Sequence, residues 1–296
     1  MIRTIDPGAI KPADLHQYLL GAVAPRPIAF ASTVDATGVP NLAPYSFFNC
    51  FSSNPPILVF SSNRRVTDNT TKDTLHNILE TKEVVINVVT YNIVRQAALT
   101  SVEYPREVSE FEKAGLTPIP SDLVKPYRVK ESPVQMECQV QDVIPLGDKG
   151  GAGYLIICRV VRLHVDEAIL DENGRIDPQR IDLMGRMGRA YYTRASGESI
   201  YTIVQPYNQI GMGFDQLPPS IRHSTVLTGN ELAQLAAQSA PPESDKVLAL
   251  QKESNIQALL QTDNPLEHLH GMVQRELAKE NLERAAHLAW LGDYLL

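Results

Sequence analysis

Residues 25–61 read PRPIAFASTVDATGVPNLAPYSFFNCFSSNPPILVFS, and this stretch decides the fold. Ile28 to Thr33 is a short apolar run typical of a buried strand, and Asp35 to Gly38 is a turn signal. β-Forming residues resume over 39–51, so the strands before and after the turn are predicted to pair as a hairpin. Asn54-Pro55-Pro56 then breaks the chain before a further apolar strand at 57–61. The stretch therefore predicts short consecutive strands joined by tight turns.

The same character continues downstream. Apolar, β-branched runs predict strands at 84–89, 134–143 and 154–165, with a glycine-rich loop, expected to be mobile, over 146–153. Short helices are expected between the strands, at 73–81, 92–101 and 109–115. Five or six strands without a regular strand–helix–strand alternation favour a mainly β, antiparallel barrel or sandwich over a parallel sheet.

The composition changes near residue 214. All seven Phe residues lie at or before Phe214, whereas 215–296 is rich in Leu, Ala and Gln and holds 6 basic against 11 acidic residues. Three helices are expected there: one after a capping box at Thr228, one over 242–260, and one from a capping box at Asn264 to Leu291. We therefore divide the chain into a barrel domain, 1–214, and an acidic helical extension, 215–296.

Charge and cysteine content exclude several classes of protein. The net charge of −7 argues against nucleic-acid binding, and no apolar run is long enough to cross a membrane. The first ten residues lack the pattern of a signal peptide. Cys50, Cys138 and Cys158 are odd in number and lack the spacing of a metal site, so we expect no metal. Buried free thiols in a reducing cytoplasm fit them best, with a reactive Cys50 as the alternative.

Residues 61–74, between a strand and a helix, combine cations with hydroxyl groups. Arg64, Arg65 and Lys72 are interleaved with serines and threonines, and the helix starting near Asp73 offers free backbone N–H groups. Cations, hydroxyl donors and a helix N-terminus together suit a phosphate group. The same pattern also fits a solvated helix cap, and it does not decide which of the two arginines faces a ligand.

Small residues and hydroxyls also gather upstream. Ser32-Thr33 and Ala43-Pro44-Tyr45-Ser46 combine small side chains with polar atoms. Such segments let a flat ligand approach the backbone, whose N–H and C=O groups can then bind its polar edge. A tight hairpin with packing constraints explains the same composition equally well.

The order and spacing of several motifs resemble the flavin reductase-like family of FMN-binding split barrels. PRPIAFAST, NLAPYSFFN, SSNPPILVFS and KDTLHNI carry this resemblance in the first part of the chain. EFEKAGLTPIPS, ESPVQMECQV and YLIICRVVRLHVDEAIL carry it further on. The similarity covers about residues 10–205, and the extension after 215 does not resemble a usual family member. The resemblance implies a six-stranded antiparallel Greek-key split barrel that forms a homodimer and binds FMN.

The resemblance also implies roles for individual residues. Ser32 and Thr33 would flank the flavin ring. Segment 42–46, with Ala43, Pro44, Tyr45 and Ser46, would present backbone groups to the pyrimidine edge. Further contacts would come from Asn49, Ser52 and Ser53, and the phosphate would be held by Ser61, Arg65, Lys72 and Thr74. No side chain is assigned a catalytic role, because hydride transfer between stacked rings needs position rather than acid–base groups.

The expected activity is that of an oxidoreductase that uses NAD(P)H to reduce flavin or a small acceptor. Family reductases often carry a histidine in the loop before the last strand, whereas this loop, 147–153, has none, which puts NAD(P)H use in doubt. A flavin-dependent oxygenase, or a non-catalytic flavin-binding protein whose tail docks a partner, remain alternatives. The roles of His164, Tyr191 and Tyr192, in the site or in packing, stay open.

Overall fold

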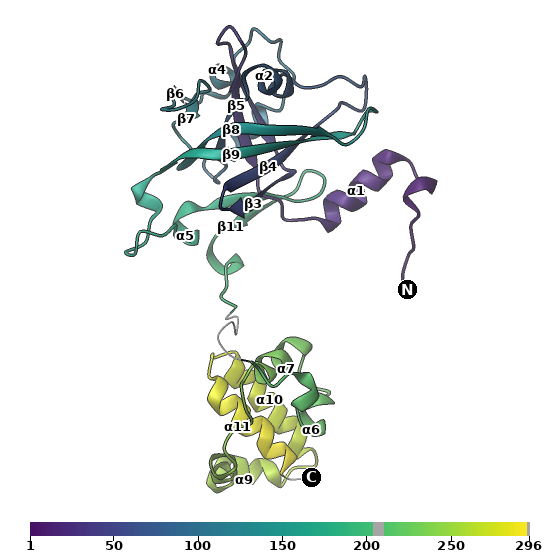
Figure 1. Cartoon of the computed structure of the whole chain (residues 1–296). Helices are drawn as coiled ribbons and strands as arrows, with labels where there is room; N and C mark the ends of the chain where they lie inside the picture. Colours follow the sequence, from purple (N-terminus) through teal and green to yellow (C-terminus); the bar gives the residue numbers. More distant parts are fainter. Residues whose placement is uncertain (204–209, 295–296) are drawn as a thin grey trace. The chain divides into compact units, whose positions relative to one another are not determined.

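The computed structural model describes residues 1–203 and 210–294. They belong to two compact units, Met1–Tyr201 and Thr202–Leu296 (Figure 1). Each unit has its own hydrophobic core. The backbone N–H groups of Met212 and Gly213 bond to carbonyls at the end of a tail helix, at 2.7 and 3.0 Å. The boundary between the units therefore lies before residue 214, where the composition placed it. Composition shows where the aromatic residues end, and it does not show where the backbone contacts change.

The first unit is built on one antiparallel sheet of seven strands, in the order β2-β1-β5-β8-β9-β4-β3. β8 and β9 are its longest strands and run together through the unit (Figure 1). The strand bounds are β1 Ala29–Val34, β2 Pro40–Tyr45, β3 Phe48–Ser53, β4 Pro56–Asn63, β5 Glu83–Val88, β8 Val134–Pro145 and β9 Gly153–Val165. Two smaller pairs of strands complete the described β structure: β6 Pro118–Ile119 with β7 Arg128–Val129, and β10 Leu183–Arg186 with β11 Tyr192–Ala195.

The two outermost strands in this order, β2 and β3, are consecutive in the chain. Ser46 and Phe47 alone join them, so the sheet must curl until its two ends approach each other. The backbone N–H of Ser61 on β4 bonds to the carbonyl of Phe47 at 2.8 Å across this junction. The sequence predicted one strand over 39–51, and the break at 46–47 explains why the split barrel has seven strands instead of six.

Two apolar clusters lie on opposite faces of β1. Ala29 and Ala31 pack with Phe60 and Ile86 in one cluster, while Phe30 belongs to the other. Every residue of β1 is buried, which explains its continuous apolar run. Cys138 and Cys158 lie in the first cluster, where burial raises the pKa of the Cys138 thiol to about 12, whereas Cys50 on β3 is exposed. The expectation of burial is therefore wrong for Cys50.

Short helices surround the sheet: α1 Pro12–Ala22, α2 Asp73–Thr81, α3 Val94–Leu99, α4 Glu110–Ala114 and α5 Pro178–Ile181. α2 has the predicted bounds, and it sends Leu75 and Ile78 into the cluster that contains Phe60. α4 ends at Gly115, whose φ of 63° is the left-handed conformation typical of a helix C-terminus.

The second unit is helical, with α6 Pro219–Arg222, α7 Gly229–Ala236, α8 Ser244–Ala249, α9 Ser254–Leu260, α10 Pro265–Leu277 and α11 Leu282–Asp293 among its described residues. The capping box at Thr228 is confirmed, but Asn264 makes no capping hydrogen bond. The long helix expected from 264 to 291 is two helices, because Glu280 is left-handed and Asn281 caps α11. Of the described helices, none combines the length and apolar character needed to cross a bilayer.

Candidate functional site

The segment between β4 and α2 places two cations close together. Arg65 donates from Nη1 to the Thr70 hydroxyl and the Thr71 carbonyl, both at 2.9 Å. Lys72 is the residue before α2 and lies close enough to Arg65 for that charge to lower its pKa, after the larger effect of burial. Arg64 turns elsewhere, to Asn69 and to the Tyr154 hydroxyl at 2.6 Å. We call Arg65 and Lys72 the cation pair.

Buried hydroxyl groups without partners adjoin the cation pair. Lys72 Nζ lies 5.4 Å from the centre of the Tyr45 ring, at the end of β2. Burial raises the pKa of the Tyr45 phenol to about 12; the hydroxyls of Thr74 and Ser62 oppose part of this rise. Neither of those hydroxyls meets the geometry of a hydrogen bond to it, and Tyr45 Oη and Ser62 Oγ have no partner among the described residues. Buried donors of this kind favour an additional ligand.

The glycine-rich loop 147–153 fixes the backbone of the cation segment. Arg64 exchanges two backbone hydrogen bonds with it: Arg64 N–H donates to Ala152 O at 2.8 Å, and Gly151 N–H donates to Arg64 O at 3.0 Å. A Cβ atom on Gly150 would lie 3.0 Å from Arg65 O and 3.1 Å from the Val66 backbone. The loop that we expected to be mobile therefore packs against residues 64–66, and Gly150 is required for the close approach.

The two predicted threonines and Ser32 lie in a second group, along β1 and α2. The Thr33 hydroxyl accepts hydrogen bonds from Asn41 and Asn77, at 3.2 and 3.1 Å. Thr74 is fully buried and accepts from the same Asn41 at 2.8 Å. Ser32 is buried as well, and its hydroxyl has no partner among the described residues. Thr74 is thus part of the packing between α2 and β2, which its position in the motif did not reveal.

The remaining predicted residues lie on β2, β3 and β4. Ala43 and Pro44 are half-buried on β2, opposite Ala31 and Phe30 of β1, and Ser46 follows them. Ser61 on β4 donates to Asn63 at 3.0 Å and lies against Gly153. On β3, the side chains of Asn49 and Ser53 are exposed and that of Ser52 is half-buried.

Arg26 is a buried structural residue that the sequence interpretation missed. Its guanidinium is almost fully buried and donates to the carbonyls of Leu20 and Val23 at the end of α1, and to Met187 O at 3.0 Å. Its Nε also reaches the Ser46 hydroxyl at 3.4 Å. The Arg26 side chain thus connects the end of α1, the loop that contains Met187, and the junction between β2 and β3. Its position between Pro25 and Pro27 was the available signal.

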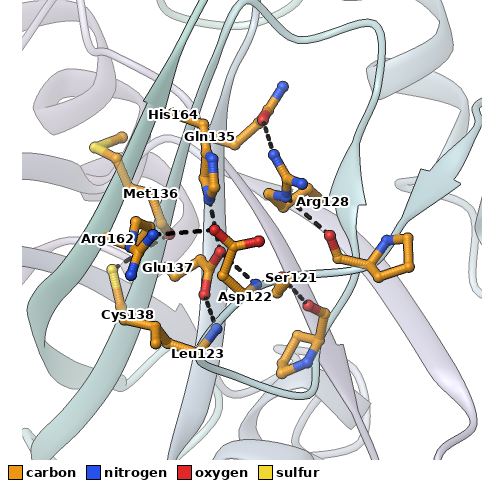
Figure 2. A network of polar contacts seen from close by, with 12 residues as sticks. Ser121, Asp122, Leu123, Arg128, Gln135, Met136, Glu137, Cys138, Arg162 and His164 are labelled. Atoms are coloured by element: carbon orange, nitrogen blue, oxygen red, sulfur yellow. Dashed lines mark hydrogen bonds and ion pairs between the residues drawn. The ribbon is translucent and has the colours of Figure 1, made fainter.

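His164 belongs to a different network, on the β8–β9 pair. Figure 2 shows His164, Glu137 and Asp122 pointing toward one another, with His164 Nε2 at 2.6 Å from Glu137 Oε1. Burial would raise the pKa of Glu137, but backbone N–H groups of Asp122 and Leu123, together with His164, bring it below its usual value. Because both carboxylate oxygens of Glu137 already accept hydrogen bonds, the group is a structural network that joins 121–123 to the sheet.

Tyr191 and Tyr192 lie after β10. Tyr191 is exposed and, with Arg3, Tyr18, Met187 and Arg189, lines an open cleft of about 710 Å³ between the N-terminal segment, α1 and the 187–191 loop. Tyr192 lies instead under the Arg186 guanidinium, 4.6 Å from the ring centre. The two neighbouring tyrosines therefore have different surroundings.

The comparisons with known proteins agree with this geometry. The family model "Flavin reductase like domain" matches residues 21–188, so the chain belongs to the flavin reductase-like family. An uncharacterized protein of Aquifex aeolicus is 42% identical over 184 residues, which cover 62% of this chain and 91% of that protein.

Solved structures give the same result. Nitrilotriacetate monooxygenase component B from Bacillus cereus is 35% identical, with a TM-score of 0.63, over 68% of this chain and 99% of that one. A 2-nitrobenzoate 2-nitroreductase from Pseudomonas fluorescens is 27% identical, with a TM-score of 0.60, over 68% and 96%. The first unit thus has the split-barrel fold of a family of flavin-binding oxidoreductases.

Proposed function

We propose that the chain binds FMN and acts as an oxidoreductase in which NAD(P)H transfers a hydride directly to flavin N5. The cation pair beside the unpartnered hydroxyls of Tyr45 and Ser62 carries this proposal. A phosphate monoester carries nearly two negative charges and strong acceptor oxygens, which match two cations and free hydroxyl donors. The residues present therefore fit FMN.

The proposed contacts divide between the phosphate and the ring. Arg65, Lys72 and Ser61 would hold the phosphate, and the buried Thr74 would fix α2 against β2 through its hydrogen bond with Asn41. Segment 42–46 and Ser32-Thr33 would orient the ring, with Asn49, Ser52 and Ser53 as outer contacts. Bound FMN supplies the redox chemistry, while the protein binds it, orients it and excludes water.

The electron acceptor is proposed to be free flavin or a small organic molecule. The names of the similar solved structures, a monooxygenase component and a nitroreductase, support electron transfer of this kind. The loop 147–153 has no histidine to help bind NAD(P)H. In this proposal the dinucleotide therefore reaches the flavin ring without a histidine from that loop.

A cytoplasmic homodimer is part of the proposal. β3 pairs with β4 alone in the described sheet, and it exposes Phe51 by 68%. A strand that is paired on one side only and exposes an aromatic side chain favours a second copy as its cover. The three free cysteines support a reducing compartment. Light scattering after gel filtration tests the dimer.

The test of function is spectroscopic. The purified chain should bind FMN with micromolar or tighter affinity, and NADH or NADPH should bleach the flavin bands under anaerobic conditions. Absence of FMN binding refutes the proposal. Bleaching only by another reductant, followed by substrate oxygenation in air, assigns the oxygenase alternative. Bound FMN that no donor reduces assigns a non-catalytic flavin-binding role, with the helical unit as the docking part.

A further inference from the structure

We propose that Glu103 is an internal substitute for the flavin phosphate: its carboxylate pairs with Arg65 in the flavin-free chain and must leave when a phosphate-bearing flavin binds. The proposal rests on the FMN site proposed above. Glu103 lies in segment 100–109 between α3 and α4, outside the family motifs quoted above, and its Oε1 is 2.5 Å from Arg65 Nε.

The two members of this ion pair differ in how firmly they are held. The Arg65 side chain is 22% exposed, and Thr70 and Thr71 fix its other edge. The Glu103 side chain is 64% exposed, and Arg65 is its one partner among the described residues. Release of Glu103 into water therefore breaks one contact and leaves the Arg65 guanidinium in place with a free donor edge.

The charges of the site make this exchange necessary. Arg65 lowers the pKa of Lys72, whereas Glu103 raises it, so Glu103 relieves part of the repulsion within the cation pair. A phosphate monoester carries nearly two negative charges and would neutralise both cations by itself. If Glu103 stayed, the site would hold an excess negative charge and Arg65 Nε would be occupied. Glu103 therefore competes with the phosphate of FMN for Arg65, and it does not change the affinity for a flavin that has no phosphate.

The experiment measures dissociation constants of FMN and riboflavin by flavin fluorescence quenching for the full chain, Glu103→Gln and Glu107→Gln. Glu107 is an exposed carboxylate of the same segment without a recorded ion pair, so it is the matched charge control. We expect Glu103→Gln to bind FMN roughly 3- to 10-fold more tightly, the scale of an exposed ion pair combined with one repulsive charge. Riboflavin affinity, and both affinities of Glu107→Gln, should change less than twofold.

A second measurement uses inorganic phosphate on the flavin-free chain. Millimolar phosphate should raise the Tm of Glu103→Gln more than that of the wild type or Glu107→Gln. Unchanged or weaker FMN binding by Glu103→Gln, or an equal gain for riboflavin, overturns the role of Glu103 while the FMN site stands. Failure of all three chains to bind either flavin refutes the proposed function itself, and the two failures are thus distinct.

Discussion

Replacement of Lys72 by methionine isolates the phosphate contribution to flavin binding. Methionine keeps an unbranched apolar stem over the Tyr45 ring and removes the charge. Thr74 is a poor companion change, because its hydroxyl is buried and bonded to Asn41. Lys72→Met therefore removes a phosphate ligand without disturbing the contact between α2 and β2.

The magnitude follows from the contacts that Lys72 can make. A hydrogen bond to a charged group contributes about 1.5–3 kcal/mol, which corresponds to roughly 10- to 150-fold in affinity for FMN. The flavin-free chain should change little, because the loss of a cation–π contact of about 0.5–1 kcal/mol is offset by relief of the burial and Arg65 repulsion that lower the pKa of Lys72.

The assay compares FMN with riboflavin for the wild type, Lys72→Met and Lys125→Met. Lys125 is exposed and its side chain contacts no partner among the described residues, so it controls for the net charge. FMN should weaken for Lys72→Met alone, and riboflavin should bind all three proteins equally. An equal loss for both flavins, or no loss for FMN, would show that the phosphate lies elsewhere.

Three further outcomes concern stability. Arg26→Met should lower the free energy of unfolding by about 1–3 kcal/mol, since it leaves partly buried carbonyls without their donor, and urea titration measures this. Glu137→Gln should cost about 1–3 kcal/mol at pH 7. The Glu137 pKa is lowered on folding, so this difference should shrink as the pH falls from about 4.3 through the folded value, which denaturation at pH 7 and pH 3 detects. Burial lowers the pKa of His270, so the helical unit should lose stability below about pH 6.5, and His270→Gln should flatten this dependence in thermal melts.

Local patterns in the sequence were enough to predict α2, most strands and the position of the cations before α2. They succeed there because a turn, a helix start and an apolar run depend on neighbouring residues. The break between β2 and β3 was not predicted, because Ser46 and Phe47 follow β-forming residues and turn only to close the sheet. The division of the helix expected over 264–291 into α10 and α11 has a similar origin, in the local geometry at Glu280 and Asn281.

The contacts that complete the site were outside the reach of sequence patterns. Arg26 bonds to Met187 across 161 positions, and Arg65 pairs with Glu103 across 38. Thr74 looked like a phosphate ligand by its place in the motif, yet the packing of α2 on β2 buries its hydroxyl. Such pairings depend on the folded topology, so the residue types indicated the ligand chemistry but not which atoms remain free for it.

The helical unit satisfies its apolar side chains internally: Leu235, Val247, Ile256 and Leu288 are all fully buried in one core of its own. A unit with its own core buries these side chains by its own packing, so the apolar stripes of the tail are accounted for within the tail itself.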